Sequence, residues 1–436
     1  MSTDEVVLRK GVYRDSVTLM RISKSLSELE GVEVAVVAMA TPLNLDLARD
    51  LGFELPAADP ADLLVAVRGE RAVAAHAELD ALLSAHAPLA AAVESDQPPL
   101  TTRSAARRTG AGVVLVSVPG EHAFAEAVDA VEAGLPVMVF SDGVPLEQEV
   151  ALKDLAAEKG VLVMGPDCGT AVIAGVGLGF ANVLRPGPVG IVAASGTGAQ
   201  QLSCLLDLAG VGVSHVLGVG GRDLSPEVGG RSANRAIAML DEDPATELIV
   251  LVSKQPAVRP AVPAKRFVEA SADLTATAER VLKELGRAVP EWPAWPAWAG
   301  RTATGTLRGI YSGGTLCAEA KGVAGTGEFV DYGDDAYTRG RPHPMIDPTL
   351  RLEALAAVAE GDVVLMDVVL GHGADPDPAA SYAHAVARCP ATVVVALIGS
   401  EGDPQDLRRQ AAAFRETGAA VFTSNAQAAR HARSLL

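Results

Sequence analysis

The sequence predicts an α/β protein built on parallel sheets, and three observations lead to this fold class. Short apolar runs rich in β-branched residues are bounded by Gly, Pro, Asp or Ser, which is typical of strands buried on both faces of a parallel sheet. Segments with helical period lie between these runs, and a βαβα alternation indicates doubly wound sheets. Hydrophobic residues make up 49% of the 436 residues and charged residues 21%, so the chain can bury several cores and is not disordered.

The individual elements follow from these runs in chain order. We expect nine strands, at Val34–Met39, Leu63–Val67, Val113–Val118, Pro136–Phe140, Val161–Met164, Val189–Ala193, Leu248–Val252, Val363–Met366 and Val393–Ile398. Helices are clearest at Val17–Leu29, Glu121–Ala133 and Leu146–Lys159.

Breaks in composition divide the chain into three domains and a linker. The first domain is expected over residues 1–186, the second over 187–290 and the third over 307–436. Residues 291–306 form the linker, in which all three tryptophans alternate with prolines as Trp292, Trp295 and Trp298. This pattern favours an extended polyproline segment whose indoles lie on the neighbouring domains, and a docking surface for a partner chain is the alternative.

Charge and cysteine usage exclude several functions. The formal net charge of −18 opposes binding to nucleic acid and to anionic membranes. The four cysteines are far apart and form no CxxC pair, so we expect neither a metal site nor a disulfide framework. No secretory leader or membrane-spanning run is visible, and we therefore expect a soluble cytoplasmic protein.

The first candidate site is the turn Ser195-Gly196-Thr197-Gly198, which follows an apolar strand and precedes a helix. Small residues expose backbone N–H groups at a helix N-terminus, where the helix dipole also favours anions. The turn therefore predicts a phosphate or anion site, with a simple helix cap as the alternative. It matches neither a Walker A loop nor a GxSxG elbow.

Two further glycine turns follow predicted strands. Gly220-Gly221-Arg222-Asp223 combines close backbone approach with a guanidinium, and an Arg222–Asp223 ion pair is the alternative interpretation. The strand that carries Asp367 leads into Gly371-His372-Gly373, a second candidate anion site at a helix N-terminus.

Polar loops supply the remaining candidates. In the segment 331–348, Arg341 and His343 could present cationic groups to an anionic substrate, and Asp347 lies nearby; an interface ion-pair loop is the alternative. Asp167 follows a predicted strand, where open α/β sheets bind ligands. We interpret its neighbour Cys168 as a buried structural thiol rather than a nucleophile.

Five segments together resemble the signatures of the FdrA family, over nearly the whole chain. They are 10–20 (KGVYRDSVTLM), 163–170 (VMGPDCGT), 194–198 (ASGTG), 220–225 (GGRDLS) and 340–350 (GRPHPMIDPTL). FdrA proteins are similar to succinyl-CoA synthetases, so the resemblance implies a Rossmann-like CoA-binding-type domain followed by two flavodoxin-like ligase domains. The family has been labelled acyl-CoA synthetase. It is also linked to oxamate carbamoyltransferase, which converts oxalurate and phosphate to oxamate and carbamoyl phosphate in allantoin breakdown.

The resemblance assigns roles to the candidate residues. In succinyl-CoA synthetase a phosphate lies between the N-termini of two helices; Ser195–Thr197 matches the first turn, and Gly371–Gly373 falls where the second would be. Arg222 or Lys254 would neutralise charge, and Arg341 and His343 would orient a carboxylate. From the motifs themselves we also expect His372 as a catalytic group and Asp167, Asp347 and Asp367 as substrate-binding groups.

Differences from the succinyl-CoA synthetase sequence favour a carbamoyltransferase over an acid–CoA ligase. The segment after Ser253 has no phosphorylatable histidine, Lys254 stands where that family has a glutamate, and the segment is shorter than in FdrA proteins. The main hypothesis is therefore a carbamoyltransferase subunit that handles phosphate or carbamoyl phosphate with partner subunits in a hetero-oligomer, a homodimer being the alternative assembly. An acid–CoA ligase with CoA as cofactor and a non-catalytic scaffold are the alternative functions.

Overall fold

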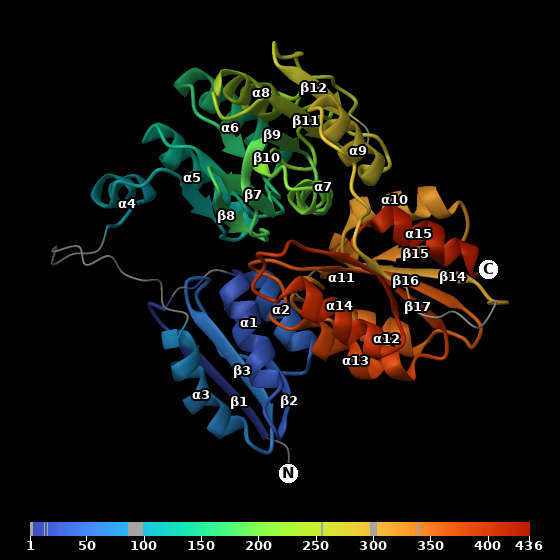
Figure 1. Cartoon of the computed structure of the whole chain (residues 1–436). Coiled ribbons are helices and arrows are strands. Elements are labelled where there is room, and N and C mark those ends of the chain that lie inside the picture. The colour runs from blue at the N-terminus through green and yellow to red at the C-terminus, as the bar shows by residue number, and fades with distance from the viewer. Residues whose placement is uncertain are drawn as a thin grey trace.

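A computed structural model of the chain describes residues 3–12, 14, 16–85, 99–253, 256–296, 303–338 and 341–436, without the side chains of residues 16, 17, 84 and 85. Two sheets of three strands and two sheets of six strands organise these residues. Figure 1 shows them as an N-terminal unit (3–85), a small parallel unit (99–164), a middle unit (170–284) and a C-terminal unit (294–434). Within these ranges, no helix has the length and apolar character needed to cross a bilayer.

The N-terminal unit differs from the prediction. Its elements are β1 (Thr3–Arg9), α1 (Ser16–Ser27), β2 (Val32–Met39), α2 (Pro42–Asp50), β3 (Leu63–Gly69) and α3 (Ala72–Ala85). The sheet has the order β1-β3-β2, and the central strand runs antiparallel to both neighbours, so the parallel sheet predicted here is wrong. Residues of α1 and α3 cover one face of β3, and Ala48 and Phe53 cover the other. A strand buried on both faces has a continuous apolar sequence in either direction, which is why the pattern misled us.

The small parallel unit is separate from the N-terminal unit. It consists of α4 (Thr102–Thr109), β4 (Val114–Val116), α5 (Gly120–Glu132), β5 (Val137–Val139), α6 (Leu146–Lys159) and β6 (Val163–Met164). Its three strands pair in parallel in the order β4-β5-β6. The expected single Rossmann-like domain over residues 1–186 is thus two sheets in the structure, because the antiparallel sheet and the parallel sheet share no paired strand.

The middle unit carries the first candidate turn. Its elements are β7 (Thr170–Ile173), β8 (Val176–Gly179), β9 (Pro186–Ala193), α7 (Gly196–Leu208), β10 (Val213–Gly218), α8 (Arg231–Glu242), β11 (Leu248–Val252), β12 (Arg266–Glu269) and α9 (Leu274–Glu284). The strand order is β12-β11-β9-β10-β7-β8, parallel up to β10 and antiparallel beyond it. The β7–β8 hairpin extends this sheet and lies before the boundary expected near residue 186.

The C-terminal unit repeats the doubly wound plan. It contains β13 (Ala294–Trp295), β14 (Leu307–Tyr311), α10 (Gly314–Ala324), β15 (Glu328–Asp331), α11 (Asp335–Thr338), α12 (Thr349–Ala356), β16 (Val363–Val369), α13 (Pro378–Arg388), β17 (Thr392–Ile398), α14 (Leu407–Glu416), β18 (Ala420–Phe422) and α15 (Asn425–Ser434). The strand order is β13-β18-β17-β16-β14-β15, and only β13 runs antiparallel to its neighbour. All nine predicted strands are confirmed by strands in these units.

One hydrophobic core joins the middle and C-terminal units. Side chains of α7 and α9 pack in the same cluster as side chains of α10 and α15. Trp292 is buried in this core and donates to Glu279 at 3.3 Å, while Trp295 in β13 packs on the other face of the C-terminal sheet. Trp298 lies outside the described residues. The shared core fixes the ends of β9 and β14, and therefore the two turns that follow them, beside one another.

Candidate active site

The Ser195 turn opens helix α7 as the sequence indicates. Strand β9 ends at Ala193, and Ser195 is the N-cap, whose Oγ accepts a hydrogen bond from Gly198 N at 3.2 Å. Both glycines are tightly packed: a Cβ on Gly196 would lie 3.1 Å from Thr170 Oγ1, and one on Gly198 would lie 3.0 Å from the side chain of Thr315. The free backbone N–H groups of this first turn and the helix dipole give it anion-binding character.

A second helix begins against this turn. Strand β14 ends at Tyr311, and Gly313 is the N-cap of α10. Ser195 Oγ donates to Thr315 Oγ1 at 2.6 Å, so the two helix N-termini are in direct contact. A Cβ on Gly313 would lie 2.6 Å from the side chain of Thr197, which means that the approach requires glycine.

The two turns line a cavity of about 450 Å³. The carboxyl ends of strands from the small, middle and C-terminal units supply its other walls, as expected for ligand sites of open α/β sheets. The described lining includes Ser117, Phe140, Asp142, Asp167, Phe180, Ser195, Thr197, Gly220, Gly221, Gly313, Thr315, Asp335, Arg341, His343, Ile346 and Met20. The predicted residues Ser195, Gly196, Thr197, Gly220, Gly221, Asp167, Arg341 and His343 are thereby brought together.

The Gly371-His372-Gly373 turn does not provide the second helix N-terminus. His372 pairs with Ala181 through two backbone hydrogen bonds, at 2.8 and 3.3 Å, and its side chain is exposed. A Cβ on Gly371 would lie 2.6 Å from Ala181 O, and one on Gly373 would lie 2.9 Å from the Phe180 ring. These glycines therefore serve close packing of the C-terminal unit on the middle unit, and the second helix N-terminus at the cavity is that of α10, which follows Ser312 and Gly313.

Asp367 acts behind the cavity wall rather than in it. It is fully buried in β16, and its Oδ1 accepts from Ser312 N at 2.8 Å and from Ser312 Oγ at 3.1 Å. Arg351 contacts the same oxygen at 3.0 Å. Burial raises the pKa of this carboxyl, and the Arg351 charge opposes that rise. Asp367 thus positions the turn that begins α10, instead of binding substrate directly as predicted.

Carboxylates occupy another part of the cavity. Asp167 lies with Asp142 and Asp335 in the lining, and its side chain is exposed to the cavity. Burial within the protein, and then the charges of Asp142 and Asp335, raise the pKa of Asp167 to about 6. Among the described residues, no group of three or more His, Cys, Asp or Glu side chains is arranged to hold a metal ion. These three carboxylates form an acidic part of the lining of the same cavity as the Ser195 and Gly313 turns.

His343 faces the cavity as a neutral ring. Its Nδ1 accepts from Met345 N at 3.2 Å, so the proton of the neutral imidazole is on Nε2. Burial, and secondarily Arg351, lower the pKa of His343 to about 4. The ring stacks near Phe180, with centroids 5.6 Å apart. Together with Arg341 it offers hydrogen-bond donors to an oxygen of a ligand.

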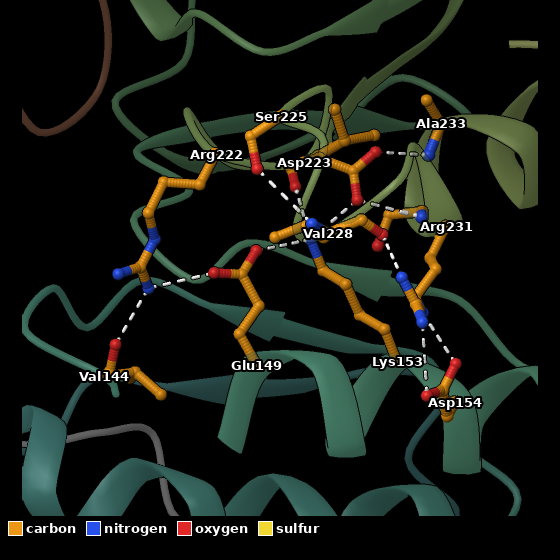
Figure 2. A network of polar contacts seen from close by, with 12 residues as sticks. Val144, Glu149, Lys153, Asp154, Arg222, Asp223, Ser225, Val228, Arg231 and Ala233 are labelled. Atoms are coloured by element: carbon orange, nitrogen blue, oxygen red, sulfur yellow. Dashed lines mark hydrogen bonds and ion pairs between the residues drawn. The ribbon is translucent and has the colours of Figure 1, made fainter. Parts of the chain in front are cut away.

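Arg222 belongs to a polar network (Figure 2) and is not among the described residues that line the cavity. It contacts Glu149 Oε2 at 2.9 Å and donates to Val144 O at 2.8 Å. Lys153 Nζ is 2.8 Å from both Glu149 Oε1 and Asp223 Oδ1, and all three of these side chains are buried. Asp223 in turn accepts from the first N–H groups of α8 at 3.0 and 2.8 Å. Asp223 thus pairs with Lys153, and Arg222 with Glu149, instead of the expected Arg222–Asp223 pair; the catalytic role of Arg222 stays a prediction.

Asp347 is not among the described residues that line the cavity. It accepts from Thr349 N at 3.0 Å and from Thr349 Oγ1 at 2.6 Å at the start of α12. Lys254 lies outside the described residues. Ser312-Gly313-Gly314-Thr315 was not among the predicted site residues, although this turn repeats the strand, small-residue turn and helix plan of the Ser195 turn.

Comparisons with known proteins extend this picture. The family described as "AllF, heavy metal-associated domain" matches residues 1–99, and the family described as "CoA-ligase" matches residues 310–435. An uncharacterized Escherichia coli (strain K12) protein, YahF, is 34% identical over 514 residues, covering 99% of this chain and 98% of that protein. This alignment exceeds the 436 residues of the chain by 78, so at least that many positions of YahF have no counterpart here.

Succinate–CoA ligase subunits are similar over a shorter span. The alpha subunit of Aquifex aeolicus (strain VF5) is 29% identical over 160 residues, and the chain covers 51% of that subunit. The alpha 1 subunit of Archaeoglobus fulgidus is 29% identical over 233 residues, 51% of this chain and 72% of that subunit. Among solved structures, ATP citrate lyase from Methanothrix soehngenii is 14% identical over 76% of this chain and 39% of that chain, with a TM-score of 0.30. A similarity with this TM-score supports no inference about the ligand or the activity of this chain.

The heavy-metal description does not fit the matched segment. Residues 1–99 contain no cysteine, and soft thiolates are the ligands that select most heavy metals.

Proposed function

The chain belongs to the same family as YahF, and from this premise and the cavity geometry we propose that it binds the phosphate of an acyl phosphate between α7 and α10, in acyl transfer of the acid–CoA ligase type. The observation that carries the proposal is the 2.6 Å contact of Ser195 Oγ with Thr315 Oγ1, which joins two helix N-termini at one cavity. Two dipoles and two hydroxyls at one point stabilise a dianionic group.

The chemistry would be displacement at the acyl carbon. The thiol of CoA would lose its proton to solvent, and the thiolate would form a C–S bond to the acyl carbon. The bond between the acyl carbon and the bridging oxygen would break, and inorganic phosphate would leave with that electron pair. The α7 and α10 turns would hold the departing phosphate. The Nε2–H of His343 would donate to the acyl oxygen, on which negative charge develops.

Phosphoryl transfer through a histidine is not part of this proposal. Residues 253–265, after β11, contain no histidine. His343 is a poor substitute nucleophile, because Met345 N occupies the Nδ1 lone pair and leaves the proton on Nε2. The acyl phosphate would therefore reach this chain from another reaction or from a partner subunit.

Carbamoyl phosphate is a second candidate, with a small carboxylate such as oxamate as the molecule that gives or receives the carbamoyl group. It is favoured by the carboxylates of Asp142, Asp167 and Asp335, which can accept hydrogen bonds from the amide N–H groups that a carbamoyl group has and an acetyl group lacks. This candidate goes with our finer proposal that the chain is an FdrA-type, cytoplasmic subunit that works with partner subunits.

Thermal shift tests both candidates. Phosphate, acetyl phosphate and carbamoyl phosphate should raise the melting temperature of the wild-type chain by mass action. Ser195→Ala should weaken phosphate binding about tenfold or more, because it removes the N-cap of α7 and the hydroxyl contact that joins the two turns. Ser424→Ala is the matched control: it removes the N-cap of α15 but should leave phosphate affinity unchanged.

The outcomes separate the proposals. Equal phosphate affinity in Ser195→Ala and wild type would contradict the proposed phosphate site between α7 and α10. Thioester formation from acetyl phosphate and CoA would support the ligase-type activity, and a larger shift with carbamoyl phosphate than with acetyl phosphate would favour the second candidate.

A further inference from the structure

Helix α1 of the N-terminal unit reaches the cavity. The side chain of Met20 lines the cavity, and no other described residue of the N-terminal unit does so. Met20 also packs against the core shared by the middle and C-terminal units, and Met345 and Ile346 line the cavity with it. The wall formed by these side chains is apolar, in contrast to the turns that begin α7 and α10.

Lys24 attaches the same helix to the C-terminal unit. Its Nζ donates to Ile346 O at 3.0 Å and lies 3.4 Å from Asp375 Oδ2. Lys24 follows Met20 by four residues, so both side chains lie on one face of α1. Ile346 is therefore a cavity residue and an anchor for Lys24 at once.

Asp375, the carboxylate next to Lys24, is itself held by hydrogen bonds. Asp375 is 7% exposed, its Oδ2 accepts from Ser381 Oγ at 2.7 Å and its Oδ1 accepts from Asp377 N at 2.9 Å. Removing Lys24 would leave this carboxylate without its cationic partner, while the contacts that hold the carboxylate would persist.

We propose that Met20 is a specificity-determining residue which limits the size of the group attached to the phosphate, and that Lys24 is the positioning residue which holds Met20 in the cavity wall. The size limit rests on the proposed function, because it assumes a phosphate between α7 and α10. The positioning by Lys24 does not depend on the ligand. A unit without metal-binding thiols thereby gains a role in ligand selection.

The size limit is tested by calorimetry with acetyl phosphate and butyryl phosphate. Met20→Ala should improve the affinity for butyryl phosphate relative to acetyl phosphate by about tenfold or more, since two methylene groups gain room. Met20→Leu, which conserves volume, should behave as wild type. If Met20→Ala still binds acetyl phosphate and its ratio of butyryl phosphate to acetyl phosphate affinity equals that of wild type, the size limit is wrong. The proposed phosphate site would be unaffected by that result.

The positioning is tested by thiol labelling of the Met20→Cys variant in a Cys389→Ser background. The remaining cysteines, Cys168, Cys204 and Cys317, are buried. Adding Lys24→Ala should raise the labelling rate of the introduced thiol about tenfold, whereas Lys283→Ala, an exposed lysine of α9, should leave it unchanged. An equal rate with and without Lys24 would overturn the positioning role, whatever ligand the cavity binds.

Discussion

Asp167 is the residue whose surroundings most change its chemistry. It combines a left-handed backbone, with φ of 57°, and a pKa raised to about 6 by burial and by Asp142 and Asp335. An acid whose pKa is raised on folding destabilises the folded state once it ionises. Stability contributed by this site is therefore present below pH 4 and is lost as the pH rises through 6.

We predict that Asp167→Asn removes this pH dependence. Asparagine has the same shape and is well tolerated in the left-handed region, so the fold should be retained. The melting temperature of the variant relative to wild type should rise between pH 4 and 7 and stay level above it. Phosphate should also bind more tightly to the variant at pH 7, because one negative charge leaves the cavity.

The exposed Asp50→Asn serves as the control and should show no such trend. A melting-temperature difference for Asp167→Asn that is independent of pH would show that Asp167 is ionised throughout this range.

Residue-level prediction from sequence worked where one strand leads directly into one turn. Ser195–Gly198 and Asp167 could be found in this way, because their positions depend on neighbouring residues in the chain. The partner turn could not: Ser312–Thr315 meets Ser195 only because α7 and α10 pack in one core, and Gly371–Gly373 had an equally suitable local sequence. Contacts over more than a hundred residues are decided by packing between units, which periodicity does not report.

At the level of elements, the approach of α7 to α10 requires a glycine at position 313. We predict that Gly313→Ala lowers phosphate affinity about tenfold or more, because its Cβ would lie 2.6 Å from Thr197 and separate the two turns. Gly322→Ala is a matched change within α10, where the new methyl group meets nothing within 4 Å. It should stabilise the chain by about 1 kcal/mol and leave affinity unchanged. Titration calorimetry and urea unfolding provide the measurements; wild-type affinity in Gly313→Ala would contradict the contact between the turns.

The same packing of helices buries an acid. Glu319 of α10 accepts from Leu274 N, the first residue of α9, at 2.6 Å and from Asn425 Nδ2 of α15 at 2.7 Å. Burial raises the pKa of this carboxyl to about 7, and these hydrogen bonds only partly oppose the rise. Its proton is therefore retained in the folded chain at pH values where the unfolded chain has lost it, so stability falls as the pH rises from about 4.5 to 7.

We predict that Glu319→Gln flattens this part of the stability profile. The wild-type free energy of unfolding should fall by roughly 3 kcal/mol more than that of the variant between pH 5 and 8, because folding raises the pKa of this carboxyl from 4.5 to about 7. Urea unfolding at several pH values measures how the free energy of unfolding of each protein changes with pH. Only this pH dependence is compared, because the amide of Gln also places a donor against Asn425 and can change the stability at every pH. Parallel profiles would indicate that Glu319 stays ionised in the folded chain.

Elements were predicted better than their arrangement. All nine apolar runs form strands, and the Leu146–Lys159 helix has the predicted bounds. The direction of β3 and the division of residues 1–186 into two sheets escaped prediction, because an apolar run shows burial and not which strand lies beside it. Short edge strands such as β8 and β13, with four and two residues, also lack a pattern long enough to recognise.

At the scale of the whole molecule, the small parallel unit is joined to the middle unit by buried charges (Figure 2). Lys153 of α6 lies between Glu149 and Asp223, and Asp223 caps α8. Arg222 reaches the same Glu149 from a side chain that is 48% exposed. This arrangement explains why GGRD at 220–223 looks like a catalytic motif in the sequence: its glycines line the cavity, while its charged residues hold two units together.

We therefore predict consequences of different size for two cations that the sequence treats alike. Lys153→Met should destabilise the chain by about 3–5 kcal/mol, because it leaves the buried Asp223 without its cationic partner and Glu149 with only the half-exposed Arg222. Arg222→Ala should cost on the order of 1 kcal/mol, since its guanidinium is half exposed and Glu149 keeps Lys153. Urea unfolding gives both values, and calorimetry below the transition should find wild-type phosphate affinity in both variants. If Arg222→Ala abolished phosphate binding at nearly wild-type stability, the charge of Arg222 would act on the ligand after all, and the network would be part of the site rather than its support.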